Sequence, residues 1–276
     1  MLPMIFIALT VILGLIRFRS VLINKLVIFK YYLKLSSYYV FLTLTSTLVL
    51  PLLLIRPKHY MNGIITSSVM RQITKLYGVK WHIRNGEILA EDRGAVIISN
   101  HQSVLDIAGM NFAWQVIWKL VLIAKKEVLY TGPLGIVTYL CGSLFIDRKK
   151  PNEAYKVLES AKELMRQNKT KIWIFPEGTR NTKWDGKLLP FKKGAFNVAV
   201  SAQVPIIPLV YSPYYFIDKD KYIFNRGHMI LQCLEPVPTE GLTMDDVPAL
   251  ADRMYQLMSR TFEQLSKEVQ SAPECQ

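Results

Sequence analysis

The N-terminal third of the chain lacks acidic residues. No aspartate or glutamate occurs before Glu87, although eleven lysines and arginines do. From Glu87 onward there remain 23 of the 34 basic residues and all 21 acidic ones, so most of the net charge of +13 belongs to the N-terminal part. A nucleic-acid-binding protein is expected to carry its basic stripe on the folded domain. Here the excess surrounds hydrophobic segments, which predicts membrane lipid, and no nucleic acid, as a partner.

Cysteine and histidine are scarce, with three and four residues. Three cysteines provide no even disulfide framework and favour a reducing, cytosol-facing domain. Cys141 lies in an apolar run, where a thiol is more often packed than nucleophilic. The histidines other than His101 stand at no ligand spacing from it, so we expect no metal site.

Two uncharged hydrophobic runs, residues 1 to 16 and 36 to 55, flank a basic connector. The second run is long enough to cross a hydrocarbon core of about 30 Å, and the first is marginal. A cleaved signal peptide is not expected, because the basic residues follow the first run instead of preceding it. We therefore expect residues 1 to 60 to form a membrane anchor of two helical segments, and residues 61 to 276 to form the folded domain.

The arrangement of this anchor has two readings. Two crossings would put the basic connector and the equally basic residues 56 to 84 on opposite sides, against the positive-inside rule. A hairpin dipping into one leaflet avoids that conflict, and hydropathy does not distinguish the two. A third uncharged run, residues 128 to 146, is interrupted by glycines and a proline. We expect it to be a buried or lipid-contacting part of the folded domain.

Short apolar runs alternate with amphipathic stretches in the remaining chain. Strands are predicted at residues 94–99, 144–146, 172–175, 204–211 and 229–233. The run 204–211 contains prolines, which predicts an irregular or edge strand. Helices are predicted after Ser103, over residues 154–165, and from about residue 243 onward. This alternation predicts an α/β fold with a mixed or largely parallel sheet flanked by helices.

Two polar signatures carry the candidate chemistry. In Asn100-His-Gln-Ser-Val-Leu-Asp106 an imidazole precedes a carboxylate, the usual pair for taking a proton from a hydroxyl. Chance produces a His-x4-Asp pair about 0.13 times in such a chain, so the spacing alone is weak. Asp106 also stands three residues after Ser103, the spacing of a helix-capping box, and could be only a cap.

The second signature, Phe175-Pro-Glu-Gly-Thr-Arg180, is a candidate anion site. Its Glu-Gly-Thr-Arg word is expected by chance on the order of once in several hundred chains. Gly178 allows close backbone approach, Thr179 adds a hydroxyl donor, and Arg180 offers paired donors for phosphate oxygens. Glu177 is more plausible as a hydrogen-bond acceptor that orients a substrate hydroxyl or an arginine than as the base. Lys193 could add charge, although a lysine pair before a helix is more often solvated.

Four segments in order resemble the motifs of the glycerolipid acyltransferases, in particular the lysophosphatidic acid (1-acylglycerol-3-phosphate) acyltransferases. They are Asn100-His-Gln-Ser-x-x-Asp106, Gly142-Ser-Leu-Phe-Ile-Asp-Arg148, Phe175-Pro-Glu-Gly-Thr-Arg180 and Val204-Pro-Ile-Ile-Pro208. The similarity spans roughly residues 85 to 235.

The resemblance implies a membrane-bound enzyme that transfers a fatty acyl group from acyl-CoA to the sn-2 hydroxyl of lysophosphatidic acid, giving phosphatidic acid. His101, oriented by Asp106, would be the base. The acceptor and its phosphate would be bound by Arg148, Glu177, Gly178, Thr179, Arg180 and Lys193. Because the thioester of acyl-CoA is already an activated acyl donor, no metal or bound cofactor is expected. The expected location is the endoplasmic reticulum membrane, with the catalytic domain facing the cytosol.

Three alternatives remain open from the sequence. The acceptor could be glycerol-3-phosphate or another lysophospholipid, as in a remodelling acyltransferase. A membrane hydrolase could use the His-Asp pair on water, but the chain has no Gly-x-Ser-x-Gly elbow. A non-enzymatic membrane scaffold would leave both signatures inert.

Overall fold

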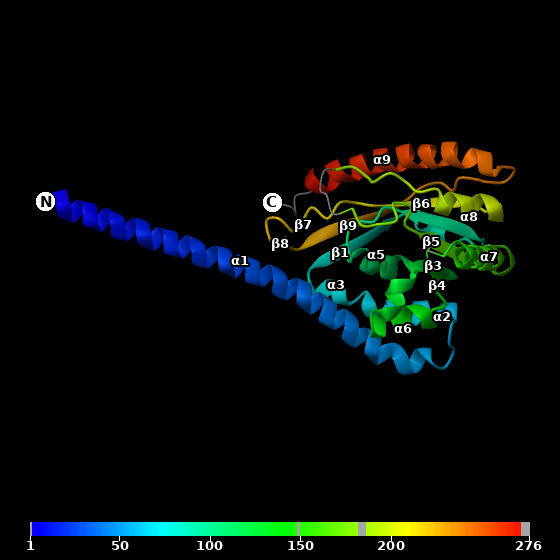
Figure 1. Ribbon diagram of the computed structural model, residues 1–276, viewed down its shortest axis with the longest axis horizontal. Helices are drawn as coiled ribbons and strands as arrows, with labels where there is room; N and C mark the ends of the chain where they lie inside the picture. Colours follow the sequence, from blue (N-terminus) through cyan, green and yellow to red (C-terminus); the bar gives the residue numbers. More distant parts are fainter. Residues whose placement is uncertain (1, 148–149, 182–185, 272–276) are drawn as a thin grey trace.

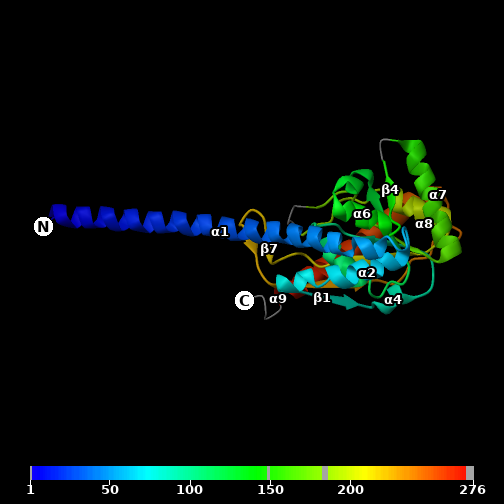
Figure 2. The same cartoon turned by 90° about the horizontal axis from the view of Figure 1, so that it is seen from below.

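The computed structural model describes residues 2–147, 150–181 and 186–271. These residues form an α/β body with helices on both faces of a central sheet, and one long N-terminal helix that projects from it (Figure 1). The projection is equally clear in the view from below (Figure 2).

Seven strands form the main sheet, in the order β1-β9-β6-β2-β5-β3-β4. All neighbouring strands pair in parallel except β6 and β9, which are antiparallel. The prediction of a largely parallel sheet flanked by helices is therefore confirmed. The strands are β1 (Val79–Arg84), β2 (Ala95–Ser99), β3 (Leu120–Lys125), β4 (Leu144–Ile146), β5 (Lys171–Ile174), β6 (Ile206–Tyr211) and β9 (Gly227–Cys233), and β7 (Ile217–Asp218) pairs with β8 (Ile223–Phe224) in a separate hairpin.

Helices cover the two faces of the sheet as separate layers (Figure 1). One layer contains α2 (Tyr60–Met70), α3 (Ile73–Leu76), α5 (Asp106–Ala113), α6 (Pro133–Leu140) and the C-terminal half of α1 (Leu2–Leu53); the other contains α7 (Pro151–Asn168), α8 (Gly194–Ala202) and α9 (Val247–Ser271). The shorter elements are α4 (Glu87–Ala90), η1 (Lys126–Tyr130) and η2 (Met244–Asp246). In β2, Ile97 packs in the first layer while Val96 and Ile98 pack in the second. Burial on both faces explains why this strand is continuously apolar.

The expected two-helix anchor is wrong in its division, because residues 2 to 53 form the single helix α1. No glycine or proline occurs between Gly14 and Pro51, so nothing in the connector interrupts the helical backbone. The hairpin arrangement needs a turn that this helix does not contain. No helix within the described ranges combines the length and hydropathy needed to cross a bilayer.

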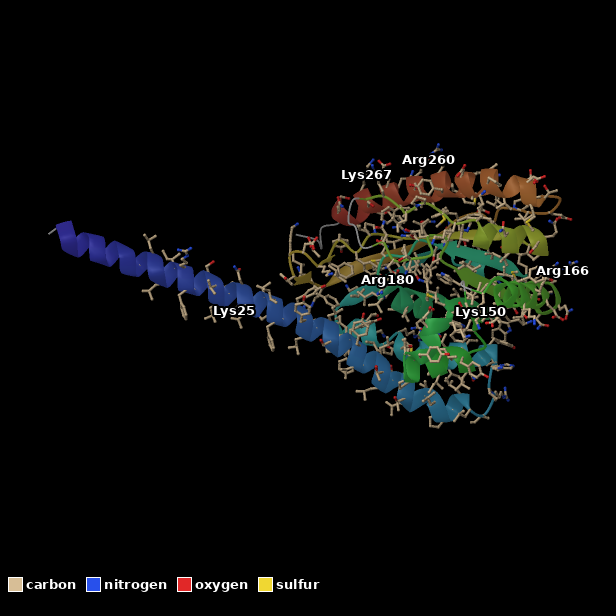
Figure 3. All side chains as sticks on the ribbon, in the orientation of Figure 1. Lys25, Lys150, Arg166, Arg180, Arg260 and Lys267 are labelled. Atoms are coloured by element: carbon tan, nitrogen blue, oxygen red, sulfur yellow. The ribbon has the colours of Figure 1, made fainter. Side chains whose placement is uncertain are left out.

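The C-terminal half of α1 packs one face against the body. Tyr38, Leu42 and Leu53 on this face are buried, whereas Leu44 and Leu48 on the opposite face are exposed. The preceding turns project freely and expose both apolar and basic side chains (Figure 3).

The run of residues 128 to 146 belongs to the folded body, where it forms most of η1, all of α6 and β4. One strand was placed wrongly: β6 lies inside the sheet, between β2 and β9, and not at an edge. Pro208 is tolerated there because it faces Leu234, one residue beyond the end of β9. Its carbonyl accepts the Leu234 N–H at 2.9 Å, and the pairing of β6 with β9 begins only at Leu209.

Candidate active site

Both polar signatures lie at one edge of the sheet. His101 follows β2 and Glu177 follows β5, and these two strands are parallel neighbours. Strand β6, on the other side of β2, ends at the same edge with Tyr211 and the loop to Tyr214. Parallel pairing therefore brings together residues that are far apart in sequence, as is usual for sites in α/β sheets.

His101 and Asp106 form the predicted pair. His101 Nδ1 lies 2.6 Å from Asp106 Oδ2, and the Asp106 side chain is fully buried. The same Oδ2 accepts the main-chain N–H groups of Gln102 at 2.7 Å and Ser103 at 3.0 Å. Asp106 thus braces the start of the loop and contacts the imidazole. Helix α5 begins at Asp106 with Leu105 at its N-cap and has no side-chain capping bond, so the geometry supports the orienting interpretation over the capping one.

These contacts define the imidazole tautomer. Because Asp106 Oδ2 acts as an acceptor toward two N–H groups, the proton of a neutral His101 belongs on Nδ1, and Nε2 keeps its lone pair. The ring stacks on Phe175, with centroids 4.1 Å apart and an interplanar angle of 20°. The His101 side chain is 22% exposed. His101 is therefore fixed in orientation while an edge of it remains reachable.

Glu177 has a role that the sequence did not indicate. Its Oε1 accepts the main-chain N–H of His101 at 2.7 Å, and its Oε2 accepts that of Leu189 at 2.9 Å. Burial raises the pKa of Glu177 to about 7, against the opposing effect of these two donors. Both oxygens accept main-chain N–H groups, so the structure shows a loop-positioning role for Glu177. Its contact with the acceptor stays a prediction.

The remaining predicted anion-site residues lie around this turn. Gly178 has a φ of 69° and closes the turn by donating its N–H to Phe175 O at 3.1 Å. Thr179 and Arg180 are exposed, as is Lys193 at the start of α8. The N–H of Lys192 donates to Pro176 O at 2.8 Å, which brings the start of α8 to the same turn. Arg148 lies outside the described residues.

A cavity of about 610 Å³ adjoins the two signatures. Gln102, Glu177 and Tyr214 line it on the side of the sheet, and Phe262, Ser266 and Gln270 line it from one stripe of α9. Its volume is in the range of small-molecule sites.

Amide side chains fasten the His101 loop to β6, a function that sequence reasoning missed. Asn100 Nδ2 donates to Tyr211 O at 3.1 Å, while Asn100 Oδ1 accepts the N–H of Tyr211 at 2.8 Å. Gln102 Nε2 donates to Ser212 O at 2.9 Å. Tyr214, whose hydroxyl donates to Asp106 Oδ1 at 2.8 Å, was also missed, and nothing in its local sequence marks it.

Two further observations concern a thiol nucleophile and metal ligands. Burial raises the pKa of Cys141 to about 12, so its thiol stays protonated and is a poor nucleophile. Within the described part of the chain, no three His, Cys, Asp or Glu side chains gather as a metal site.

Comparisons with known proteins identify relatives of the chain. A family model described as Acyltransferase matches residues 80–212. The 1-acyl-sn-glycerol-3-phosphate acyltransferase alpha of Homo sapiens is 39% identical over 238 residues, which cover 86% of this chain and 83% of that protein. The human beta enzyme is 44% identical over 207 residues, covering 75% and 73%.

A solved structure has the same fold. The 1-acyl-sn-glycerophosphate (LPA) acyltransferase PlsC of Thermotoga maritima matches with a TM-score of 0.56 and 24% identity, over 81% of this chain and 94% of that one. This match shows the fold. The sequence relatives show that the chain is a member of the 1-acyl-sn-glycerol-3-phosphate acyltransferase family of enzymes, as its motifs predicted.

Proposed function

We propose that the chain transfers a fatty acyl group from acyl-CoA to the sn-2 hydroxyl of lysophosphatidic acid, giving phosphatidic acid and free coenzyme A. The observation that carries the proposal is the 2.6 Å contact between His101 Nδ1 and Asp106 Oδ2. It prepares Nε2 to accept a proton. The names of the human relatives support the acceptor.

The reaction needs one proton acceptor and two positioned substrates. Nε2 of His101 takes the proton of the acceptor hydroxyl as its oxygen attacks the thioester carbonyl. The carbon–sulfur bond then breaks, and the leaving thiolate takes the proton back from Nε2. Asp106 remains ionised and stabilises the transient imidazolium. This sequence of steps requires no metal or bound cofactor, because the thioester supplies the activated acyl group.

Binding is assigned to the exposed cations and the cavity. Arg180 and Lys193, with Gly178 and Thr179 of the turn, hold the phosphate monoester of the acceptor in this proposal, together with Arg148. The cavity beside Gln102 and Glu177 holds part of a substrate, since it reaches the loop that carries His101.

The proposal also includes a membrane surface. The projecting turns of α1 expose Phe18, Leu22 and Phe29 beside basic residues, among them Lys25, labelled in Figure 3. A helix with this composition suits the interface of an anionic bilayer, which delivers both amphiphilic substrates. We assign the enzyme to the endoplasmic reticulum with the catalytic domain in the cytosol, in keeping with the free thiols of Cys141 and Cys233.

The test is product identification. Purified protein is incubated with one acyl-CoA and lysophosphatidic acid acylated at sn-1, and the product is digested with phospholipase A2 before mass spectrometry. We expect phosphatidic acid from which phospholipase A2 releases the transferred acyl chain. Absence of phosphatidic acid, or hydrolysis of acyl-CoA alone, would contradict the proposal.

A further inference from the structure

The buried carboxylate of Asp106 has a second strong contact, on the side away from His101. Its Oδ1 accepts the Tyr214 hydroxyl at 2.8 Å, and the side chains of both residues are fully buried. The Tyr214 ring is held edge-on by Trp81 and by Phe216, with centroids 6.4 and 5.9 Å away. A hydrogen-bonded chain thus runs from Tyr214 through Asp106 to His101.

We propose that Tyr214 is a positioning residue for this pair: its hydroxyl fixes the plane of the Asp106 carboxylate and tunes the strength with which that carboxylate holds the imidazole. The inference rests on the proposed role of His101 as the base. It assigns a part in the reaction to a tyrosine that lies outside both signatures.

The geometric argument concerns rotation of the carboxylate. The contacts of Asp106 with His101, Gln102 and Ser103 are all made by Oδ2. A bond to the other oxygen, Oδ1, is needed to fix the plane of the carboxylate, and Tyr214 supplies it. A buried oxygen without a donor would also be costly, so the hydroxyl satisfies Oδ1 where water is excluded.

The electrostatic argument concerns proton affinity. A hydroxyl that donates to a carboxylate withdraws charge from it and weakens it as an acceptor. Burial raises the pKa of Tyr214 well above its usual value, so the hydroxyl keeps its proton and remains a donor. Removing it should make Asp106 hold the imidazolium more strongly.

Other titratable groups face Asp106 and must be separated from this effect. Tyr38 of α1 and Glu177 after β5 both interact with its charge. The Tyr211 hydroxyl donates to the main-chain carbonyl of Asp106 at 3.1 Å, and its side chain is as buried as that of Tyr214. Tyr211 is therefore a matched control, because its hydroxyl contacts the same residue without touching the carboxylate.

The experiment compares Tyr214→Phe with Tyr211→Phe in the full chain. For each variant, the pH dependence of kcat/KM is measured, and the His101 imidazole is titrated by NMR. We expect Tyr214→Phe to lower kcat about tenfold and to move the acid limb and the His101 titration to higher pH by about 0.5 to 1 unit. Tyr211→Phe should lower Tm and leave both titrations in place.

A second variant gives the opposite sign and preserves the fold. Replacing Tyr214 with 3-fluorotyrosine makes the phenol more acidic and a stronger donor, so both titrations should move to lower pH. The inference is wrong, and Tyr214 is only structural, if neither the acid limb of kcat/KM nor the His101 titration moves. This result must hold in the fluorinated protein and in any folded Tyr214→Phe protein. A wild-type protein without acyl transfer would instead refute the proposed function, while the NMR titration would still judge Tyr214.

Discussion

Glu177 and His101 are joined by a 2.7 Å hydrogen bond from the main-chain N–H of His101 to the Glu177 carboxyl. The second signature therefore supports the first through the backbone. Since the other Glu177 oxygen accepts the N–H of Leu189, one buried side chain ties the base-bearing loop to the segment before α8. The pKa of about 7 makes this link sensitive to pH.

Glu177→Gln tests the link. Glutamine retains one acceptor oxygen and turns an amide N–H₂ toward the other donor, so the variant should lose about 1–3 kcal/mol of stability and much of its kcat. The pH dependence has a definite sign. The carboxyl titrates near 4.5 when unperturbed and at about 7 in the fold, so the unfolded chain loses its proton first and the free energy of unfolding falls as pH rises between these values.

Denaturant titrations of the purified protein between pH 4 and 8 measure this dependence. Glu177→Gln should flatten the curve in that window, whereas Glu163→Gln on the exposed surface of α7 should leave it unchanged. If the free energy of unfolding depends equally on pH in the wild type and in Glu177→Gln, Glu177 does not cause this dependence.

His101→Ala should lower kcat by about 10² to 10⁴ and change Tm little, because the imidazole acts in the transition state and is partly exposed. Asp106→Asn should also be severely impaired. Both carboxylate oxygens of Asp106 accept hydrogen bonds. Asparagine keeps one acceptor oxygen and replaces the other with an N–H₂ group that cannot accept, although it is a competent residue at a helix terminus. Near-normal turnover in Asp106→Asn would remove Asp106 from the catalytic assignment.

Ser266→Trp should obstruct the cavity beside the loop. The side chain lies on the α9 stripe that lines it, so we expect the KM of one substrate to rise about tenfold while the KM of the other changes little. Gln264→Trp is the matched control, since residue 264 is exposed on the same helix. Unchanged KM values for both substrates in Ser266→Trp would exclude the cavity from binding.

Sidedness can be read from glycosylation. Asn168-Lys-Thr170 is an acceptor sequence, and Asn168 is exposed at the end of α7. If the domain faces the cytosol, no glycan should be added on endoplasmic reticulum membranes. Because Thr170 is buried, Gln264→Asn supplies a second acceptor sequence together with Ser266, and residue 264 is exposed on α9. A glycosidase-sensitive mass shift at either position would place the domain in the lumen.

The sequence predicted the strands that have strong apolar runs, including β2, β5 and β9, and it also predicted α7 and α9. Strand β1 escaped notice because Lys80, His82 and Arg84 alternate with its apolar residues. The location of β6 was misjudged because a proline's tolerance depends on its exact partner, here Leu234 beyond the end of β9. Patterns along the chain do not contain such pairings.

In the candidate site, too, some contacts could be predicted from the sequence and others could not. His101 and Asp106 are close in sequence, and their contact follows from local spacing. The contacts of Glu177 with Leu189 and of Tyr214 with Asp106 depend on how loops fold across the sheet edge. Neither contact has a local sequence signature, so only the structure could reveal them.

The most direct measurement is a competition between acceptors. Equal concentrations of lysophosphatidic acid and lysophosphatidylcholine are offered with one acyl-CoA, and both diacyl products are quantified by mass spectrometry. Arg180 favours a terminal phosphate monoester over a shielded diester, so phosphatidic acid should predominate by at least about tenfold, and Arg180→Ala should reduce that ratio. Equal formation of phosphatidylcholine by the unmodified protein would contradict the account.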